Sequence, residues 1–238
     1  MKNAIFWDFH NTLVYTKTPR MWTSALREAL AAQGITPERD VLLRHVMTCC
    51  PWDAPDEDWR ATVGAAFWPY VFTRFDALYR EAGFTGDTAP LNAAVRATII
   101  APASYALFDD TISTLKACKS LGYNNHVLSN NYPELEQVVA ALGLREFFGE
   151  VITSGIVGYD KPRRELFDHA RALAGDPAVI YMVGDSPTAD VGGGNAAGMT
   201  SILVHNEADC GASFTCATLA EIPQILQATQ QYPLQIHD

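Results

Sequence analysis

The sequence predicts an α/β protein in which an open parallel sheet carries one long helical insertion. Two patterns predict this fold. Short apolar runs, rich in β-branched or aromatic residues, alternate with helical patterns over most of the chain, and this alternation is typical of parallel βαβ units. The stretch from about residue 16 to residue 100 breaks the rhythm, because it contains helical patterns but no convincing strand.

The apolar runs of the expected sheet are short, as in strands that are buried on both faces. They lie at residues 4–7, 126–128, 151–153, 179–183 and 201–204. Apolar stripes at helical spacing lie between them, at 115–121, 135–142 and 166–173. Residues 188–198 are rich in alanine and glycine, which permits a helix to pack closely on a sheet.

The insertion is expected to be all-helical. Residues 22–30 form one amphipathic segment, and apolar residues recur at helical spacing from 59 to 78 behind acidic residues at 56–58 that favour a helix start. Residues 34–37 and 83–90 are expected to be loops. We therefore expect an α/β core made of 1–15 and 101–238, and a helical insertion at 16–100.

Size and charge exclude several classes of protein. The chain has 238 residues, 48% of them hydrophobic, so it can bury a full core and is not dominated by disorder. Its formal net charge is −10 and its longest basic run is Arg163-Arg164, which argues against a general nucleic-acid binder. A negative field also repels phosphorylated substrates, so a site for them would need local compensation such as a metal.

The cysteines and the N-terminus favour a cytoplasmic protein. Five cysteines are present, and no CxxC or Cys/His pair has the spacing of a zinc site. We interpret them as buried or incidental thiols in a reducing compartment, with a redox or metal device at adjacent Cys49-Cys50 as the alternative. The first residues become polar too early for a signal peptide, and no stretch approaches the ~20 apolar residues of a membrane helix.

Two of the predicted strands end in carboxylates. Asp8 follows the first strand directly, and Asp185 and Asp190 follow the strand at 179–183. The carboxyl edge of an open α/β sheet is where ligands bind. Carboxylates that converge there can hold a hard cation, which takes oxygen ligands. Each could instead cap a backbone amide.

Polar groups of a different kind follow two other strands. Ser129, Asn130 and Asn131 come after the second core strand, and this hydroxyl and two amides suit hydrogen bonding to anionic oxygens, although Ser-Asn-Asn is also an ordinary turn sequence. Lys161 precedes a proline after the strand at 151–153, where its amine could reach a phosphate or a carboxylate, or remain at the surface.

Together these segments resemble the haloacid dehalogenase superfamily, which is dominated by phosphatases. The resemblance covers the whole chain. The stretch 8–13 (Asp-Phe-His-Asn-Thr-Leu) resembles the first family motif, Ser129 the second, Lys161 the third, and Gly184-Asp185 with Asp190 the fourth. It implies a Rossmann-like core, and it makes the helical insertion a cap domain of the kind that many members carry after the first strand.

The resemblance also implies a two-step phosphoryl transfer. Asp8 would be the nucleophile that forms an aspartyl-phosphate. Mg²⁺ would be held by Asp8, the backbone carbonyl of His10 and Asp185, with Asp190 bound directly or through water. The phosphoryl oxygens would be held by Ser129, Asn130 and Lys161, and Lys161 would also shield the charge of Asp8.

His10 departs from the family pattern. Most phosphatases of the superfamily have a second aspartate at this position, which protonates the leaving group and then activates water. An imidazole can do this work, or His10 could be a structural or substrate-contacting residue whose backbone alone serves the metal. Asn11 stands where the family has glycine, and asparagine tolerates the positive φ of such a turn.

The departure leaves other activities open. Dehalogenases of the superfamily also lack the second aspartate, but they do not keep the paired acids that Asp185 and Asp190 provide. Phosphonatases carry a cap lysine, and no lysine occurs here between Lys17 and Lys116. A third alternative is a binding or regulatory protein that has lost turnover.

We expect a magnesium-dependent phosphatase of a small phosphorylated metabolite. The sequence specifies neither the ester nor the oligomeric state. Arg20, Arg44 and His45 are candidates for substrate contacts in the insertion, although an exposed, solvated role is favoured for each.

Overall fold

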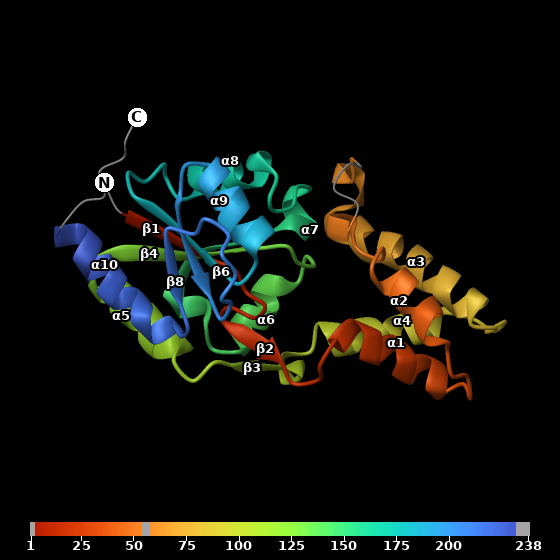
Figure 1. Cartoon of the computed structure of the whole chain (residues 1–238). Helices are drawn as coiled ribbons and strands as arrows, with labels where there is room; N and C mark the ends of the chain where they lie inside the picture. Colours follow the sequence, from red (N-terminus) through yellow and green to blue (C-terminus); the bar gives the residue numbers. More distant parts are fainter. Residues whose placement is uncertain (1–2, 54–57, 232–238) are drawn as a thin grey trace.

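The computed structural model describes residues 3–53 and 58–231 (Figure 1). Its strands are β1 (Asn3–Trp7), β2 (Val14–Thr16), β3 (Tyr105–Leu107), β4 (Tyr123–Ser129), β5 (Phe148–Thr153), β6 (Ile180–Gly184), β7 (Thr200–Val204) and β8 (Phe214–Cys216). Its α-helices are α1 (Met21–Ala31), α2 (Arg39–Val46), α3 (Phe67–Glu81), α4 (Ala89–Ile99), α5 (Thr111–Ser120), α6 (Leu135–Ala141), α7 (Ser154–Val157), α8 (Arg164–Leu173), α9 (Gly193–Ala196) and α10 (Ile222–Gln231).

The main sheet is parallel and has the strand order β5-β4-β1-β6-β7-β8. The predicted α/β class with an open parallel sheet is therefore confirmed, and each apolar run lies in one of its strands. The chain leaves β1 toward β4 and β5 on one side, and then returns to β6, β7 and β8 on the other. This reversal beside β1 is the place where α/β sheets bind ligands.

Alternate residues of the central strands pack into two separate layers. Ile5, Trp7, Val127 and Val183 belong to the core cluster that contains the apolar side chains of α5, α6 and α10. The residues next to them along the strands belong to a second cluster, which also contains side chains of α8. The members of this cluster include Phe6, Leu128, Met182, Leu166 and Phe167. Figure 1 shows α5 and α10 on one side of the sheet, and α8 and α9 on the other. This two-sided cover explains why the strands are apolar throughout.

The insertion folds into α1–α4, which Figure 1 shows gathered to one side of the sheet. Two expected boundaries within it are wrong: the helix expected from residue 59 begins at Phe67, and the loop expected at 83–90 ends where α4 starts, at Ala89. Short 3₁₀ turns at Arg60–Thr62 and Gly64–Ala66 occupy the preceding residues. Gly64 has a φ of +57°, which is incompatible with a right-handed helix, so the apolar periodicity continues while the helix does not. Residues 54–57 lie outside the described residues.

A short antiparallel ribbon connects the insertion to the sheet. β2 pairs with β3, so the chain enters and leaves the helical segment at neighbouring positions. We propose a core of 1–15 and 101–238 and a cap of 16–100, a division that has both junctions at this ribbon.

Contacts between α3, α4 and the segment before α6 join the insertion to the sheet layer. The Trp68 indole Nε1 donates to both carboxylate oxygens of Glu134 at 3.0 Å, and Arg96 forms an ion pair with the same carboxylate. The Trp68 and Tyr132 rings lie 6.1 Å apart, centre to centre.

Among the described residues, no helix is long and apolar enough to cross a membrane.

Candidate active site

Three adjacent strands bring the predicted site residues together. Asp8 follows β1, Ser129 ends β4 and Asp185 follows β6, and these strands are neighbours in the order β4-β1-β6. Parallel strands end at the same edge, so residues distant in sequence meet there. The side chains line a cavity of about 160 Å³, to which His10, Asn130, Lys161 and Asp190 also contribute.

Lys161 links two of the carboxylates. Its buried amine donates to Asp8 Oδ1 at 2.7 Å, to Asp190 Oδ1 at 2.6 Å and to the Leu128 carbonyl at 2.8 Å. Burial alone would lower the pKa of Lys161, but the charges of Asp190 and Asp8 outweigh it and raise that pKa above its ordinary value. The amine is therefore a fixed positive charge beside Asp8.

Asp8, Asp185 and Asp190 form a compact carboxylate cluster. One oxygen of each lies within 4.8 Å of the others. Burial, and then the charges of Asp8 and Asp190, raise the pKa of Asp185 to about 7. Burial also raises the pKa of Asp190, although Lys161 opposes the shift. The positive charge of Lys161 therefore does not fully offset the negative charge of the three carboxylates.

The donor set of this cluster fits a hard divalent cation. All of its side-chain ligands are oxygens, which is what Mg²⁺ prefers. The His10 carbonyl accepts no hydrogen bond from the described residues, so it is also free to act as a ligand. A cation there would lower the raised pKa values of Asp185 and Asp190, because it favours their charged forms.

Asn130 supports Lys161 directly. Its side-chain amide accepts a hydrogen bond from the Lys161 backbone N–H at 2.7 Å and donates to the Lys161 carbonyl at 2.9 Å. The amide thus fixes the loop that delivers the lysine. Ser129, whose hydroxyl accepts a long bond of 3.4 Å from Asn131, lines the cavity beside it.

His10 lies against Tyr105, with the two rings stacked 5.4 Å apart and inclined by 23°. The Asn131 amide nitrogen approaches His10 Nδ1 at 3.4 Å. Since that nitrogen of Asn131 is a donor, Nδ1 accepts and the imidazole proton resides on Nε2, an inference from the hydrogen-bond pattern. Burial lowers the pKa of His10, with Asp8 opposing the effect and Lys161 adding to it, so the ring is neutral near pH 7.

Asn131, whose amide was expected to bond anionic oxygens, lies beside His10, a contact that sequence reasoning missed. It connects Ser129 to His10, and its own backbone N–H is held by Ser154 at 3.0 Å. The Ser-Asn-Asn run placed Asn131 in the right loop. It gave no means of assigning the second asparagine to His10, because that contact depends on the arrangement of two strands.

Two local features set the positions of the carboxylates. Asn11 has a φ of +55°, which turns the chain directly after Asp8 and His10. At the end of β6, a Cβ on Gly184 would lie 2.1 Å from the carboxylate of Asp190. Asp190 itself lies in a π-helical segment, Pro187–Gly192, and accepts a hydrogen bond from the Ser186 N–H at 2.9 Å.

The candidate substrate contacts in the insertion lie elsewhere. Arg44 and His45, both on α2, pair with Glu81 of α3, and the His45 Nε2 to Glu81 Oε2 distance is 2.7 Å. Arg20 lines a separate cavity within the insertion. Among the residues that line the 160 Å³ cavity, none comes from α1–α4.

A family model of haloacid dehalogenase-like hydrolases matches residues 2–198. The chain is 37% identical over 128 residues to a glyceraldehyde 3-phosphate phosphatase of Methanothermobacter thermautotrophicus, a match that covers 51% of this chain and 56% of the relative. The chain spans about half the length of the curated relatives it matches.

Solved structures share the whole fold. HAD-hydrolase YfnB from Bacillus subtilis, determined with bound magnesium, superposes with a TM-score of 0.70 at 22% identity, over 95% of this chain and 99% of that one. A 2-haloacid dehalogenase from Pseudomonas syringae has the same TM-score of 0.70 and identity of 22%, over 96% of this chain and 99% of that one. At these identities the likeness shows the fold alone.

Proposed function

The chain belongs to the haloacid dehalogenase-like hydrolase family, and on that premise we propose that it is a magnesium-dependent phosphatase that acts on a small phosphomonoester through Asp8. One observation carries the proposal. Three carboxylates and one buried lysine converge at the carboxyl edge of β1 and β6, with Lys161 bonded to both Asp8 and Asp190. This combination suits the transfer of an anionic group to a carboxylate.

Asp8 is the proposed nucleophile. One of its carboxylate oxygens forms a bond to phosphorus while the bond between phosphorus and the alcohol oxygen breaks, and the leaving oxygen takes a proton from His10 or from water. Water then attacks the same phosphorus, the bond to Asp8 breaks, and phosphate is released. Lys161 fixes the orientation of Asp8 throughout and offsets its charge.

Asp8, Asp185, Asp190 and the His10 carbonyl would hold Mg²⁺, which supplies positive charge to the transferring phosphoryl group when bound. Two observations support this ligand set: the oxygen-only donors and the raised pKa of Asp185. Ser129 would hold a phosphoryl oxygen through its hydroxyl. Because the Asn130 amide is bonded to Lys161, a phosphate contact by Asn130 would use its backbone N–H.

The cavity and one relative support the proposed substrate class. A cavity of about 160 Å³ admits a phosphoryl group and a small part of its alcohol. A relative named as a glyceraldehyde 3-phosphate phosphatase supports a small phosphorylated metabolite as the substrate class. The proposed location is the cytoplasm, where the protein would encounter such metabolites.

The test is a panel of phosphorylated metabolites and p-nitrophenyl phosphate, assayed with Mg²⁺ and with excess chelator, alongside 2-chloropropionate. We expect phosphate release that requires Mg²⁺, and no chloride release. Undiminished hydrolysis in chelator would contradict the metal requirement, and chloride release would identify a dehalogenase. A folded protein that binds Mg²⁺ but turns over no ester would favour a regulatory role.

A further inference from the structure

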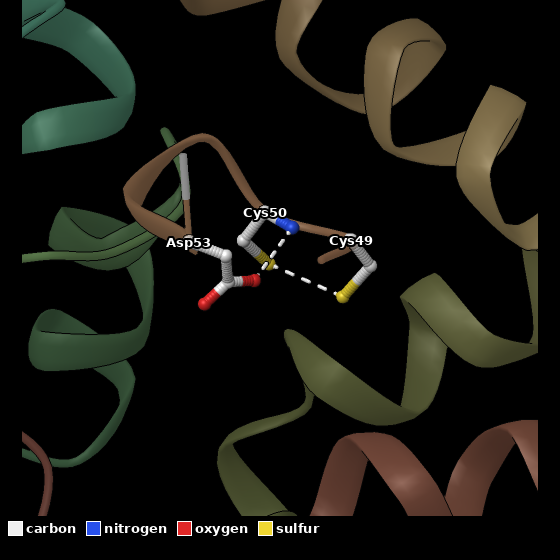
Figure 2. Close-up of side chains that lie close together, drawn as sticks. All are labelled: Cys49, Cys50 and Asp53. Carbon is white, nitrogen blue, oxygen red and sulfur yellow. Dashed lines mark hydrogen bonds between the residues drawn. The ribbon is translucent and has the colours of Figure 1, made fainter. Parts of the chain in front are cut away.

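A second cluster of metal-ligating side chains lies in the insertion, outside the candidate active site. Figure 2 shows the side chains of Cys49, Cys50 and Asp53 close together; the two cysteines follow α2, and Asp53 ends the turn Pro51–Asp53. The two thiol sulfurs are 3.5 Å apart, and both cysteines are buried. One ligand atom of each residue lies within 4.8 Å of the others.

The local backbone creates this convergence. Successive side chains of an extended chain point to opposite sides, but here the chain turns. The Asp53 N–H donates to the Cys50 carbonyl at 3.0 Å, and the Cys50 N–H donates to Asp53 Oδ2 at 3.0 Å. These reciprocal bonds hold the carboxylate beside the sulfurs.

The sulfur separation matches that of a chelating pair. Two thiolates bound at about 2.3 Å to a tetrahedral ion lie roughly 3.8 Å apart, close to the observed 3.5 Å. A disulfide would require about 2.05 Å, and both cysteines are free. A small adjustment of either side chain would therefore accommodate an ion.

The cluster lacks a cation of its own. Burial raises the pKa of Asp53 to about 6, and within residues 3–53 and 58–231 no ion pair involves Asp53. Among the described residues, the thiols make only weak bonds, to each other and from Cys49 to the Val46 carbonyl at 3.2 Å. A divalent ion would satisfy all three groups.

A cavity of about 490 Å³ adjoins the three residues and is also lined by Arg20 and Arg39. Two thiolates and a carboxylate carry one more negative charge than a divalent ion neutralises, and the two guanidinium groups lie along the same cavity. Three protein ligands leave the fourth tetrahedral position free, as in zinc sites that accept water or a ligand.

We propose that Cys49, Cys50 and Asp53 form a binding site for a thiophilic divalent cation of the zinc class, with one coordination position open to the adjacent cavity. Its ligands differ in kind from those of the Asp8 cluster. Thiolates select soft ions, whereas an oxygen-only set selects Mg²⁺. The two sites would therefore hold different metals in one chain.

The test is a titration of the reduced, metal-free full chain with Cd²⁺, followed by the ultraviolet charge-transfer band that only thiolate-bound cadmium gives. We expect the band to saturate at one ion per chain. Cys49→Ser and Cys50→Ser should each abolish it, and Asp53→Asn should weaken the apparent Cd²⁺ affinity by on the order of 10-fold or more.

Two kinds of control separate this site from the rest of the protein. Cys118→Ser and Cys216→Ser remove buried thiols elsewhere and should leave the titration unchanged, as should Asp8→Asn at the other cluster. Circular dichroism verifies that each variant is folded. Should the Cys50 variant fail to fold, the Asp53 variant still decides the matter, because it leaves both thiols intact.

Three results would overturn the proposal. The first is no charge-transfer band in the folded wild-type chain. The second is a band that survives in folded Cys49→Ser or Cys50→Ser but is lost in Cys118→Ser or Cys216→Ser. The third is an unchanged Cd²⁺ affinity in Asp53→Asn, which would remove the carboxylate from the site.

Discussion

At the scale of single residues, the surroundings of His10 bear on how a proton would reach the leaving group. Burial lowers its pKa, so the ring is neutral near pH 7, and the Asn131 contact assigns its proton to Nε2. A neutral imidazole is a weak acid, and its one basic nitrogen, Nδ1, already accepts a hydrogen bond from Asn131. His10 would therefore act as a base only by releasing the Asn131 contact, and as an acid only if a bound phosphate dianion raises its pKa.

A leaving-group comparison tests whether His10 acts as the acid. If its imidazole protonates the departing oxygen, His10→Ala should slow alkyl phosphates by roughly 10²–10⁴-fold more than p-nitrophenyl phosphate, whose anion leaves without a proton. The measurement is kcat/KM for both esters in the wild type and the variant.

A carboxylate at the same position provides the matched control. His10→Asp should restore hydrolysis of alkyl esters and remove any pH dependence that the imidazole causes. Equal slowing of both esters by His10→Ala would instead indicate a positioning role. Unchanged rates would leave the backbone carbonyl as the functional part of His10.

At the scale of elements, the junction of β6 with the π-helical segment sets the position of Asp190. Because a Cβ on Gly184 would lie 2.1 Å from that carboxylate, Gly184→Ala must displace the side chain of Asp190. The hydrogen bond from Lys161 to Asp190 would then be disturbed as well. Misplacing a site group by about 1 Å can cost ~10²-fold in rate. We expect at least that loss in kcat/KM.

Gly192→Ala, in the same segment, is the control for Gly184→Ala. A Cβ there would lie 3.5 Å from the Pro187 carbonyl, an ordinary contact, so activity should be retained. Equal activity of the two variants would show that the close approach of β6 to Asp190 has no functional effect.

Elements with a strong local signal were predictable, and those defined by distant partners were not. Five of the six strands of the main sheet contain a short apolar run, and these five were found. β2, β3 and β8 have three residues each, too few for a periodic pattern, and β2 exists only because β3 pairs with it across the insertion. The late start of α3 depends on the backbone of Gly64, which a hydrophobic pattern does not record.

The same distinction applies to the site residues. Asp8, Ser129, Lys161 and Asp185 each follow a predictable strand or its loop, and the family motifs specify them. The amide of Asn130 was expected at phosphate and instead bonds to the backbone of Lys161. Such a contact depends on how two loops approach each other, for which one sequence carries no local signal.

At the scale of the whole molecule, metal binding and pH should act together on stability. Burial and the neighbouring carboxylates raise the pKa of Asp185 to about 7 in the folded, metal-free chain, from the ordinary value of 3.8 for an aspartate side chain. Ionising Asp185 therefore opposes folding: its favourable contribution is complete below about pH 4 and is lost as the pH rises through 7. A bound cation reverses this by favouring the ionised carboxylate.

Saturating Mg²⁺ should therefore raise the melting temperature more at about pH 7.5 than at about pH 5.5. At a hundred times Kd the linkage is worth about 2.7 kcal/mol, or roughly 5–10 °C for a chain of this size. Scanning calorimetry with Mg²⁺ and with chelator measures the shift. A larger shift at the lower pH would contradict the assignment of Asp185 as a ligand.

The negative charge of the whole chain, −10, repels phosphate esters at long range. Productive binding therefore depends on local positive charge, and Lys161 is already engaged with two carboxylates. In the proposed function, the remaining positive charge would come from Mg²⁺, and the proposal depends most on covalent catalysis at Asp8.

The most direct test is to look for the phosphoryl group on Asp8. The protein is mixed with Mg²⁺ and a phosphomonoester that it hydrolyses, quenched in acid during turnover, digested and analysed by mass spectrometry. We expect one added phosphoryl group on the peptide that contains Asp8, absent without Mg²⁺. Folded Asp8→Asn should be unlabelled and slower by several orders of magnitude. Near-normal turnover by Asp8→Asn would contradict covalent catalysis at Asp8.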